Sequence, residues 1–123
     1  FILPVMSNTE SSLQMALADL RRPDLPARRR AIETLLAAEA VDELIDALRE
    51  NEHWFIRMAA AQALGQLRAA AAVSALIEAL YATHDEWMQF DIVLALLQIG
   101  TPDARAAVQV WKQTAKNSIL IVD

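Results

Sequence analysis

Hydrophobic residues recur along the chain with the spacing of an amphipathic helix. In residues 56–67 five apolar residues fall at i, i+4, i+7, i+8 and i+11, which places them on one stripe of a helix. This stripe consists of Ile56, Ala60, Ala63, Leu64 and Leu67. It returns at an offset of 32 as Met88, Ile92, Ala95, Leu96 and Ile99, and the same offset toward the N-terminus gives a fainter form, Arg28, Ala31, Ile32 and Leu35. The pattern predicts three similar helices, each packed through this stripe.

A second kind of helix alternates with the first. Its apolar stripe is Val41, Leu44, Ile45 and Leu48, and it returns at the same offset of 32 as Val73, Leu76, Ile77 and Leu80. Another copy follows at an offset of 31 as Ala104, Ala107, Val108 and Trp111, and one precedes at an offset of 28 as Leu13, Ala16, Leu17 and Leu20. The chain therefore consists of a half unit followed by three two-helix units. We predict an all-α fold, an α-α superhelix of about seven short helices and about three and a half repeats.

The composition supports close-packed helices and removes several classes of function. Of 123 residues, 55% are hydrophobic but only 6% are aromatic, and the chain has no Cys. The lack of Cys excludes disulfides, thiolate zinc sites, iron–sulfur clusters and cysteine nucleophiles. His53 and His84 occupy equivalent turns, where the polarity of a turn explains them better than metal binding does. We therefore expect no metal site and no cofactor.

Charge and hydropathy argue against nucleic acid and membrane as partners. The formal net charge is -5, and the five arginines within residues 21–30 have no aromatic residues between them. The longest apolar runs have six residues, far fewer than the ~20 that a membrane-spanning helix needs. We expect a cytoplasmic protein that binds neither nucleic acid nor a membrane.

Three segments of the chain differ in character. Residues 1–6 are mostly apolar and lack the basic start of a signal peptide, so we interpret them as an added remnant or a disordered arm. Residues 7–116 carry all the repeats and are predicted to form one domain. Residues 117–123 are mostly apolar, and we interpret them as a tail that caps the last repeat or is exchanged with a partner.

Short motifs in the repeats resemble a known family. Residues 55–80 contain Ile-Arg at 56–57, Ala-Leu-Gly at 63–65 and Ala-Leu-Ile-Glu-Ala-Leu at 75–80. Residues 94–104 add Leu-Ala-Leu-Leu-Gln-Ile-Gly-Thr-Pro-Asp-Ala, with a glycine turn between two helices. These segments resemble the short HEAT-like repeat of phycobilisome lyase proteins, over residues 12–112 in all. The resemblance implies a short right-handed HEAT-like α-solenoid, and its motif is one of packing rather than of chemistry.

The chain departs from the family pattern in two places. The arginine that the family carries after a hydrophobic residue is Arg57 in one unit but Gln89 in the next, which predicts a weaker polar ladder there. The first unit lacks both glycines of the motif, so its alignment over residues 23–40 is free to slip by several positions.

The second helix of each unit carries a candidate binding surface. In a solenoid of this kind the second helices line the concave side. Their outward polar residues grade from acidic to basic along the chain. They are Asp42, Asp46 and Arg49, then Ser74, Glu78 and Tyr81, then Arg105, Gln109 and Lys112. We interpret them as a recognition surface for a protein or peptide of complementary charge, with an ordinary solvated face as the alternative.

Two tryptophans stand at the start of first helices. Trp54 and Trp87 each follow a polar stretch and are expected near the edge between repeats. They form either a platform for a tetrapyrrole or a partner side chain, or a packing contact across the turn.

The first helix of the last two-helix unit carries a second apolar stripe, formed by Phe90, Val93, Leu94 and Leu97. A terminal repeat normally has a polar outer side, so we expect another element to cover this stripe. The cover is either the tail, through Ile119, Leu120, Ile121 and Val122, or the same surface of a second subunit. The tail could also form a strand shared between copies or an anchor in a partner's groove. A homodimer through the C-terminal tail is therefore one expectation.

The residues support binding better than catalysis. No acid–base pair or nucleophile–base arrangement stands out in the sequence. We therefore expect a non-enzymatic scaffold or adaptor that binds a partner protein or peptide on its second helices. The alternative, implied by the resemblance, is a subunit or relative of a phycobilin lyase that holds a linear tetrapyrrole and its acceptor phycobiliprotein.

Overall fold

The structure is a computed structural model that describes the backbone of residues 8–51 and 53–122 and the side chains of residues 10–51 and 53–114. This part of the chain contains seven α-helices, one short 3-10 turn and no strand. The elements are α1 (Asn8–Asp19), α2 (Leu25–Ala37), α3 (Val41–Glu50), α4 (Trp54–Gln66), η1 (Ala70–Ala72), α5 (Val73–Ala82), α6 (Glu86–Ile99) and α7 (Pro102–Val122). The predicted all-α fold is confirmed, and the arm expected at residues 1–6 lies outside the described residues.

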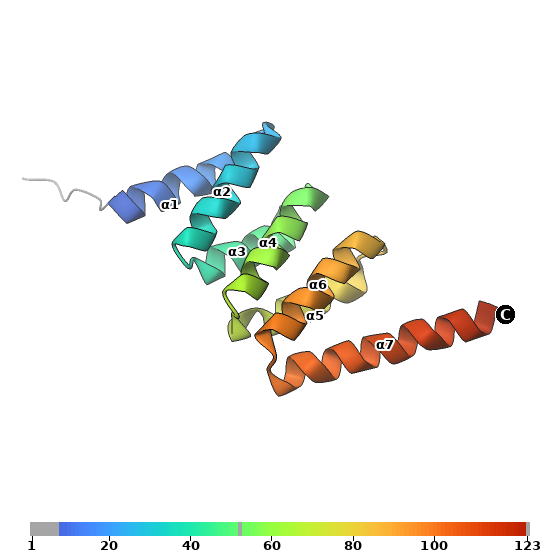
Figure 1. The fold of residues 1–123 in the computed structure, drawn as a ribbon. Coiled ribbons are helices and arrows are strands. Elements are labelled where there is room, and N and C mark those ends of the chain that lie inside the picture. The colour runs from blue at the N-terminus through green and yellow to red at the C-terminus, as the bar shows by residue number, and fades with distance from the viewer. Residues whose placement is uncertain (1–7, 52, 123) are drawn as a thin grey trace, which may run out of the picture.

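The helices form two layers of a short α-solenoid. Helices α2, α4 and α6 stack side by side, and α3 and α5 lie behind them (Figure 1). Among the second helices, each first helix packs most closely against the one that precedes it, which gives the pairs α1/α2, α3/α4 and α5/α6, and α7 packs on α6. The seven helices occur in the order that the predicted half unit and three two-helix units require.

The core is made of the two predicted stripes. The largest fully buried side chains are Leu35, Leu44, Leu48, Ile56, Leu64, Leu76, Leu80, Ile92, Leu96 and Val108. Burial of each such side chain stabilises the fold by about 1.5–3 kcal/mol, so these positions supply most of the driving force. Small residues let neighbouring first helices approach closely, as where Gly65 of α4 lies against Ala95 of α6.

One polar contact recurs in every unit and fixes the register of the repeats. Arg57 Nη1 donates to the carbonyl of Asn51 at 2.8 Å, and Gln89 Nε2 donates to the carbonyl of Thr83 at 3.0 Å. Arg28 Nε makes the same contact with the carbonyl of Arg22, also six residues earlier. Each first helix is thereby tied to the end of the second helix before it. The ladder continues at Gln89, with a neutral donor in place of a charged one.

The recurring contact corrects the alignment of the first unit. It makes Arg28 of α2 equivalent to Arg57 of α4. Both helices have 13 residues, and they start at Leu25 and Trp54. The first helix of the first unit therefore matches that of the second unit at an offset of 29, not at the offset of 32 expected from the apolar stripe, whereas the second helices α3 and α5 keep the offset of 32. The two alignments differ by three residues, which is nearly one helical turn, so both place apolar residues on the same face.

The C-terminal segment differs from the expected separate tail. Gly100 ends α6 in the left-handed conformation (φ 68°), as the glycine turn predicts, and α7 then runs without a break from Pro102 to Val122. Residues 117–122 thus continue a helix, which extends past the stacked repeats in Figure 1. The backbone of this segment is helical rather than a strand, because no Gly or Pro interrupts the helix after Pro102. The side chains of Ile119, Leu120, Ile121 and Val122 lie outside the described residues.

Candidate functional site

The polar residues predicted on the second helices are all exposed. They project from α3 (Asp42, Asp46, Arg49), α5 (Ser74, Glu78, Tyr81) and α7 (Arg105, Gln109, Lys112). Neighbouring units are linked across this surface, because Arg49 Nη2 of α3 lies 3.4 Å from Glu78 Oε2 of α5. Both side chains of the pair are about half exposed or more, so the pair contributes little to stability. The pair brings one positive and one negative charge together between the two repeats.

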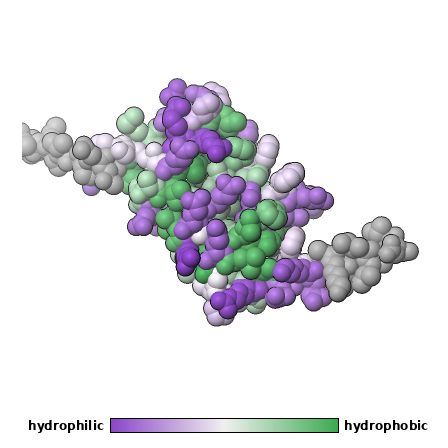
Figure 2. All heavy atoms as spheres, viewed as in Figure 1, coloured by the Kyte–Doolittle hydropathy of each residue, from purple (hydrophilic) through white to green (hydrophobic). Residues whose placement is uncertain are grey.

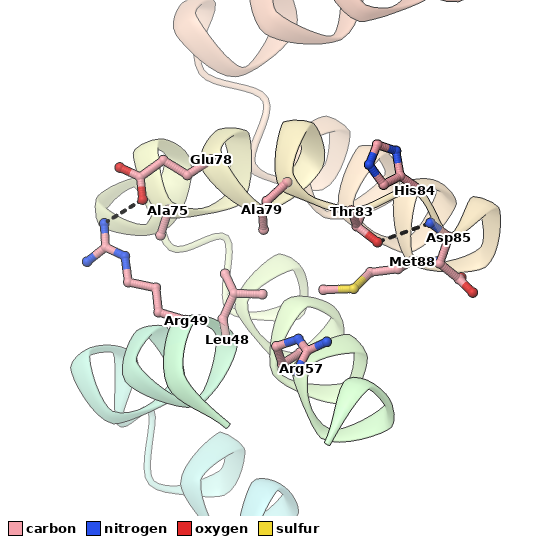
Figure 3. Close-up of a pocket in the computed structure, with 11 residues that line it drawn as sticks. Leu48, Arg49, Arg57, Ala75, Glu78, Ala79, Thr83, His84, Asp85 and Met88 are labelled. Atoms are coloured by element: carbon pink, nitrogen blue, oxygen red, sulfur yellow. Dashed lines mark hydrogen bonds and ion pairs between the residues drawn. The ribbon is translucent and has the colours of Figure 1, made fainter. Parts of the chain in front are cut away.

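A groove of about 590 Å³ lies beside this ion pair, between α3 and α5, and we call it the α3–α5 groove. It is lined by Leu48, Arg49, Arg57, Ala75, Glu78, Ala79, Ala82, Thr83, His84, Asp85 and Met88. Figure 3 shows Arg49 and Glu78 at one end, His84 and Asp85 at the other, and Leu48, Ala79 and Met88 between them. The groove therefore has an apolar middle and polar ends.

The polar ends of the groove are held by the turns that precede the first helices. Asp85 is the N-cap of α6, where its Oδ1 accepts from the Met88 amide at 2.8 Å. The hydroxyl of Thr83 accepts from the Asp85 amide at 3.2 Å, which orients the turn. Arg57 reaches the groove from α4 and is fixed by its bond to the carbonyl of Asn51. These bonds hold the rim of the groove in place before any partner binds.

A second groove, of about 460 Å³, lies between α1 and α3, and we call it the α1–α3 groove. It is lined by Leu17, Leu20, Arg21, Glu43, Asp46, Ala47, Glu50 and Asn51. Asp46 belongs to the predicted binding surface, as Arg49 and Glu78 do in the first groove. The structure therefore gathers part of the predicted surface around two neighbouring grooves, with α3 between them.

Asn51 connects four helices through hydrogen bonds, a role that the sequence pattern did not predict. Its Nδ2 donates to the carbonyl of Leu20 at 3.2 Å, and its Oδ1 accepts from Arg28 Nη1 at 3.2 Å and from the His53 amide at 3.0 Å. The signal that could have revealed it is a polar residue at the end of each second helix, since Thr83 stands at the equivalent position one unit later. Asn51 also lines the α1–α3 groove, so it couples the shape of that groove to the packing of the repeats.

The two tryptophans differ in their surroundings. Trp54 is 51% exposed, stacks on His53 with ring centroids 6.0 Å apart and meets Phe55 edge-on at 5.7 Å. Trp87 is 75% exposed. His53 caps α4, because its Nδ1 accepts from the Phe55 amide. The ring contacts of Trp54 are thus with its two neighbours in the sequence, whereas Trp87 is mostly exposed.

An apolar patch covers the outer side of α6, and we call it the α6 end face. Phe90, Leu94 and Leu97 are 58%, 42% and 47% exposed. Figure 2 shows the hydrophobic side chains gathered over this helix, next to α7. Val93 was expected in the same stripe but is buried in the core. It follows Ile92 by about 100° around the helix, which places it between the buried and exposed stripes.

Among the described residues, no helix is both long and apolar enough to cross a membrane. No group of three or more His, Asp or Glu side chains within the same residues could hold a metal ion.

Stacked helix pairs with a continuous core, in which each pair contacts only its neighbours, define an α-solenoid repeat protein. The family model for HEAT repeats matches residues 13–96 and again residues 41–118, so the chain belongs to the HEAT-repeat family. HEAT repeats commonly mediate contacts between proteins. No curated protein matches the chain. The phycobilisome-lyase type of repeat remains a resemblance of the sequence.

Proposed function

We propose that this protein is a non-enzymatic adaptor of the cytoplasm that binds a segment of a partner protein on the second-helix face, with the α3–α5 groove as the main contact. The observation that carries the proposal is the pairing of an apolar middle with a prearranged polar rim. The apolar middle gains free energy when a partner side chain displaces water, at about 25 cal/mol per Å². The charged rim favours one orientation of the partner over others.

The size of the groove suits this role. Its volume of about 590 Å³ falls in the range of ~300–1,000 Å³ that is usual for ligand pockets. The groups around it already have structural tasks: Arg49 pairs with Glu78, Asp85 caps α6, and Arg57 holds a carbonyl. Groups that are engaged in this way favour binding over proton transfer. The alternative of a bilin-lyase relative rests on the resemblance of the repeats alone.

Filling the α3–α5 groove should weaken partner binding strongly. Peptides are first selected from a random display library on the immobilised full chain. Ala82 is exposed and lines the groove, so Ala82→Trp fills it without disturbing the core. We expect the selected peptides to bind this variant at least about tenfold more weakly by fluorescence anisotropy.

The matched control adds the same side chain on the other layer. Gln66 is exposed at the end of α4, and Gln66→Trp should leave peptide affinity unchanged. Circular dichroism melts of both variants show that they remain folded. Peptides that bind Ala82→Trp as tightly as the unmodified protein would contradict the proposal, as would a selection that enriches no peptide.

We also propose that the α6 end face is covered by a second copy of the chain. Helices α2, α4 and α6 form a continuous stack, and the end face is the next surface in it. On α4 the equivalent positions, Met58, Gln62 and Gly65, are more polar or smaller than Phe90, Leu94 and Leu97 on α6. A large apolar surface at the end of a stack is suited to a symmetric contact with its own copy.

A charge in the centre of the α6 end face should prevent this association. We expect light scattering after size-exclusion chromatography to give a dimer for the unmodified chain and a monomer for Leu94→Glu, because a carboxylate cannot be buried there unpaired. Gln66→Glu adds the same charge elsewhere and should remain dimeric. Truncation after Asn117 measures the contribution of the last turns of α7. A monomeric unmodified chain, or a dimeric Leu94→Glu, would rule out this interface.

A further inference from the structure

The two grooves are the same structural position in successive repeats. Asp46, Ala47 and Glu50 of α3 line the α1–α3 groove, and their equivalents one unit later, Glu78, Ala79 and Ala82 of α5, line the α3–α5 groove. The other walls also correspond, since Arg21 follows α1 at the position that Arg49 has in α3. Two equivalent grooves on either side of α3 can therefore receive two side chains of one partner segment.

The two grooves differ in charge because some equivalent positions carry different residues. Glu43 and Glu50 of the α1–α3 groove are replaced by Ala75 and Ala82 in the α3–α5 groove. With Asp46, the α1–α3 groove holds three carboxylates and one guanidinium, that of Arg21.

The charges of the α3–α5 groove balance, because Arg49 and Arg57 stand against Glu78 and Asp85. The carboxylates of Glu43, Asp46 and Glu50 form no ion pair with the described residues. One groove is thus neutral and apolar in its middle, and its neighbour has an excess of negative charge.

We propose that the two grooves together bind one extended segment of a partner protein, with an apolar side chain in the α3–α5 groove and a Lys or Arg side chain in the α1–α3 groove. This inference rests on the proposed function and specifies the partner that it requires. A long basic side chain can lay its methylene stem along Leu17 and Leu20 and bring its charge to the carboxylates. Hydrogen bonds between charged partners are the stronger kind.

The spacing of the grooves indicates the conformation of the segment. Packed helices lie about 8–10 Å apart, which is the distance expected between grooves on either side of α3. A polyproline II segment rises ~3.1 Å per residue with three residues per turn, so side chains three positions apart point the same way ~9 Å apart. A β-strand would place side chains three positions apart on opposite faces. We therefore expect the apolar and basic residues to be three positions apart.

The test exchanges the residues that distinguish the grooves. Glu50 and Ala82 are equivalent and both exposed, so Glu50→Ala and Ala82→Glu convert each groove toward the other without altering the core. Random peptide libraries are selected on the unmodified full chain and on both variants. We expect the unmodified chain to enrich an apolar residue and a Lys or Arg three positions apart, with binding that weakens as salt rises.

The variants should change this preference in opposite directions. On Ala82→Glu, selection should favour a basic residue at the formerly apolar position. Replacing the Lys of a selected peptide with Glu should cost about tenfold in affinity on the unmodified chain and clearly less on Glu50→Ala.

The outcomes separate this inference from the proposed function. Binding that is lost on Ala82→Trp but shows no apolar–basic spacing would overturn the inference and leave the adaptor function standing. An unchanged dependence on the peptide Lys in Glu50→Ala would do the same. Binding that ignores Ala82→Trp would overturn both, because the peptides would then bind elsewhere on the protein.

Discussion

Replacing Gly65 with valine is expected to lower the free energy of unfolding by about 3 kcal/mol. A Cβ atom at this position would lie 2.8 Å from the Cα atom of Ala95 and 2.9 Å from its Cβ atom. The nearest atom is Oε1 of the Gln98 side chain, which can move aside, but the backbone of Ala95 cannot, so α4 and α6 must separate to admit the larger residue. Separation would loosen the packing of Leu64 and Leu96, both of which are fully buried.

Urea unfolding followed by circular dichroism measures this effect. Gln66→Val is the matched control, because it places the same β-branched residue at the next, exposed position of α4. The control should lose less than about 1 kcal/mol, the cost of helix propensity alone. Equal losses in the two variants would contradict the close approach of α4 and α6.

Replacing Arg28 with alanine is expected to cost about 2–3 kcal/mol of stability. The side chain is only 5% exposed, and its guanidinium donates to the carbonyl of Arg22 and to Asn51 Oδ1. Removal takes one donor from each of these acceptors at the junction of α1, α2 and α3, and Asn51 Oδ1 then accepts only from the His53 amide among the described residues. The loss should also disturb the α1–α3 groove, because Asn51 lines it.

Arg30→Ala provides the control for the loss of a charge. Arg30 is exposed on the same helix, so its replacement should change stability by less than about 0.5 kcal/mol. Thermal and urea unfolding of both variants give the comparison. If Arg28→Ala proved as stable as Arg30→Ala, the buried arginine would not be part of the junction between the repeats.

The fold was largely predictable from the sequence because large apolar residues mark the buried stripes. Ile56, Leu64 and Leu76 recur with helical spacing and are fully buried. The first unit was misaligned because a shift of nearly one helical turn keeps its alanines and leucines on the same face. Only the polar contact of Arg28, a bond to a carbonyl six residues earlier, distinguishes the two alignments. That contact depends on main-chain geometry, which apolar spacing does not report.

The C-terminal tail and Val93 show a second limit of predicting structure from the spacing of hydrophobic residues. The β-branched residues of the tail suggested a separate segment, but the continuous hydrogen bonding of α7 prevails because nothing interrupts the helix. Val93 lies between two stripes, and tertiary packing assigned it to the core.

The candidate site was only partly predictable. Exposure of Asp46, Arg49 and Glu78 follows from their place opposite a buried stripe. The α3–α5 groove was not foreseen, because it forms where the side chains of α5 are small. In the sequence, Ala79 and Ala82 are ordinary helix residues, and only the folded structure shows that they line a groove.

The proposed binding surface is tested most directly by the change in backbone amide chemical shifts when a selected peptide is added to the isotope-labelled full chain. We expect the largest changes along α3 and α5 and in residues 83–85, the turn before α6 that borders the α3–α5 groove. Changes confined to the outer faces of α2, α4 and α6 would contradict it, because the partner would then bind the other layer of the solenoid.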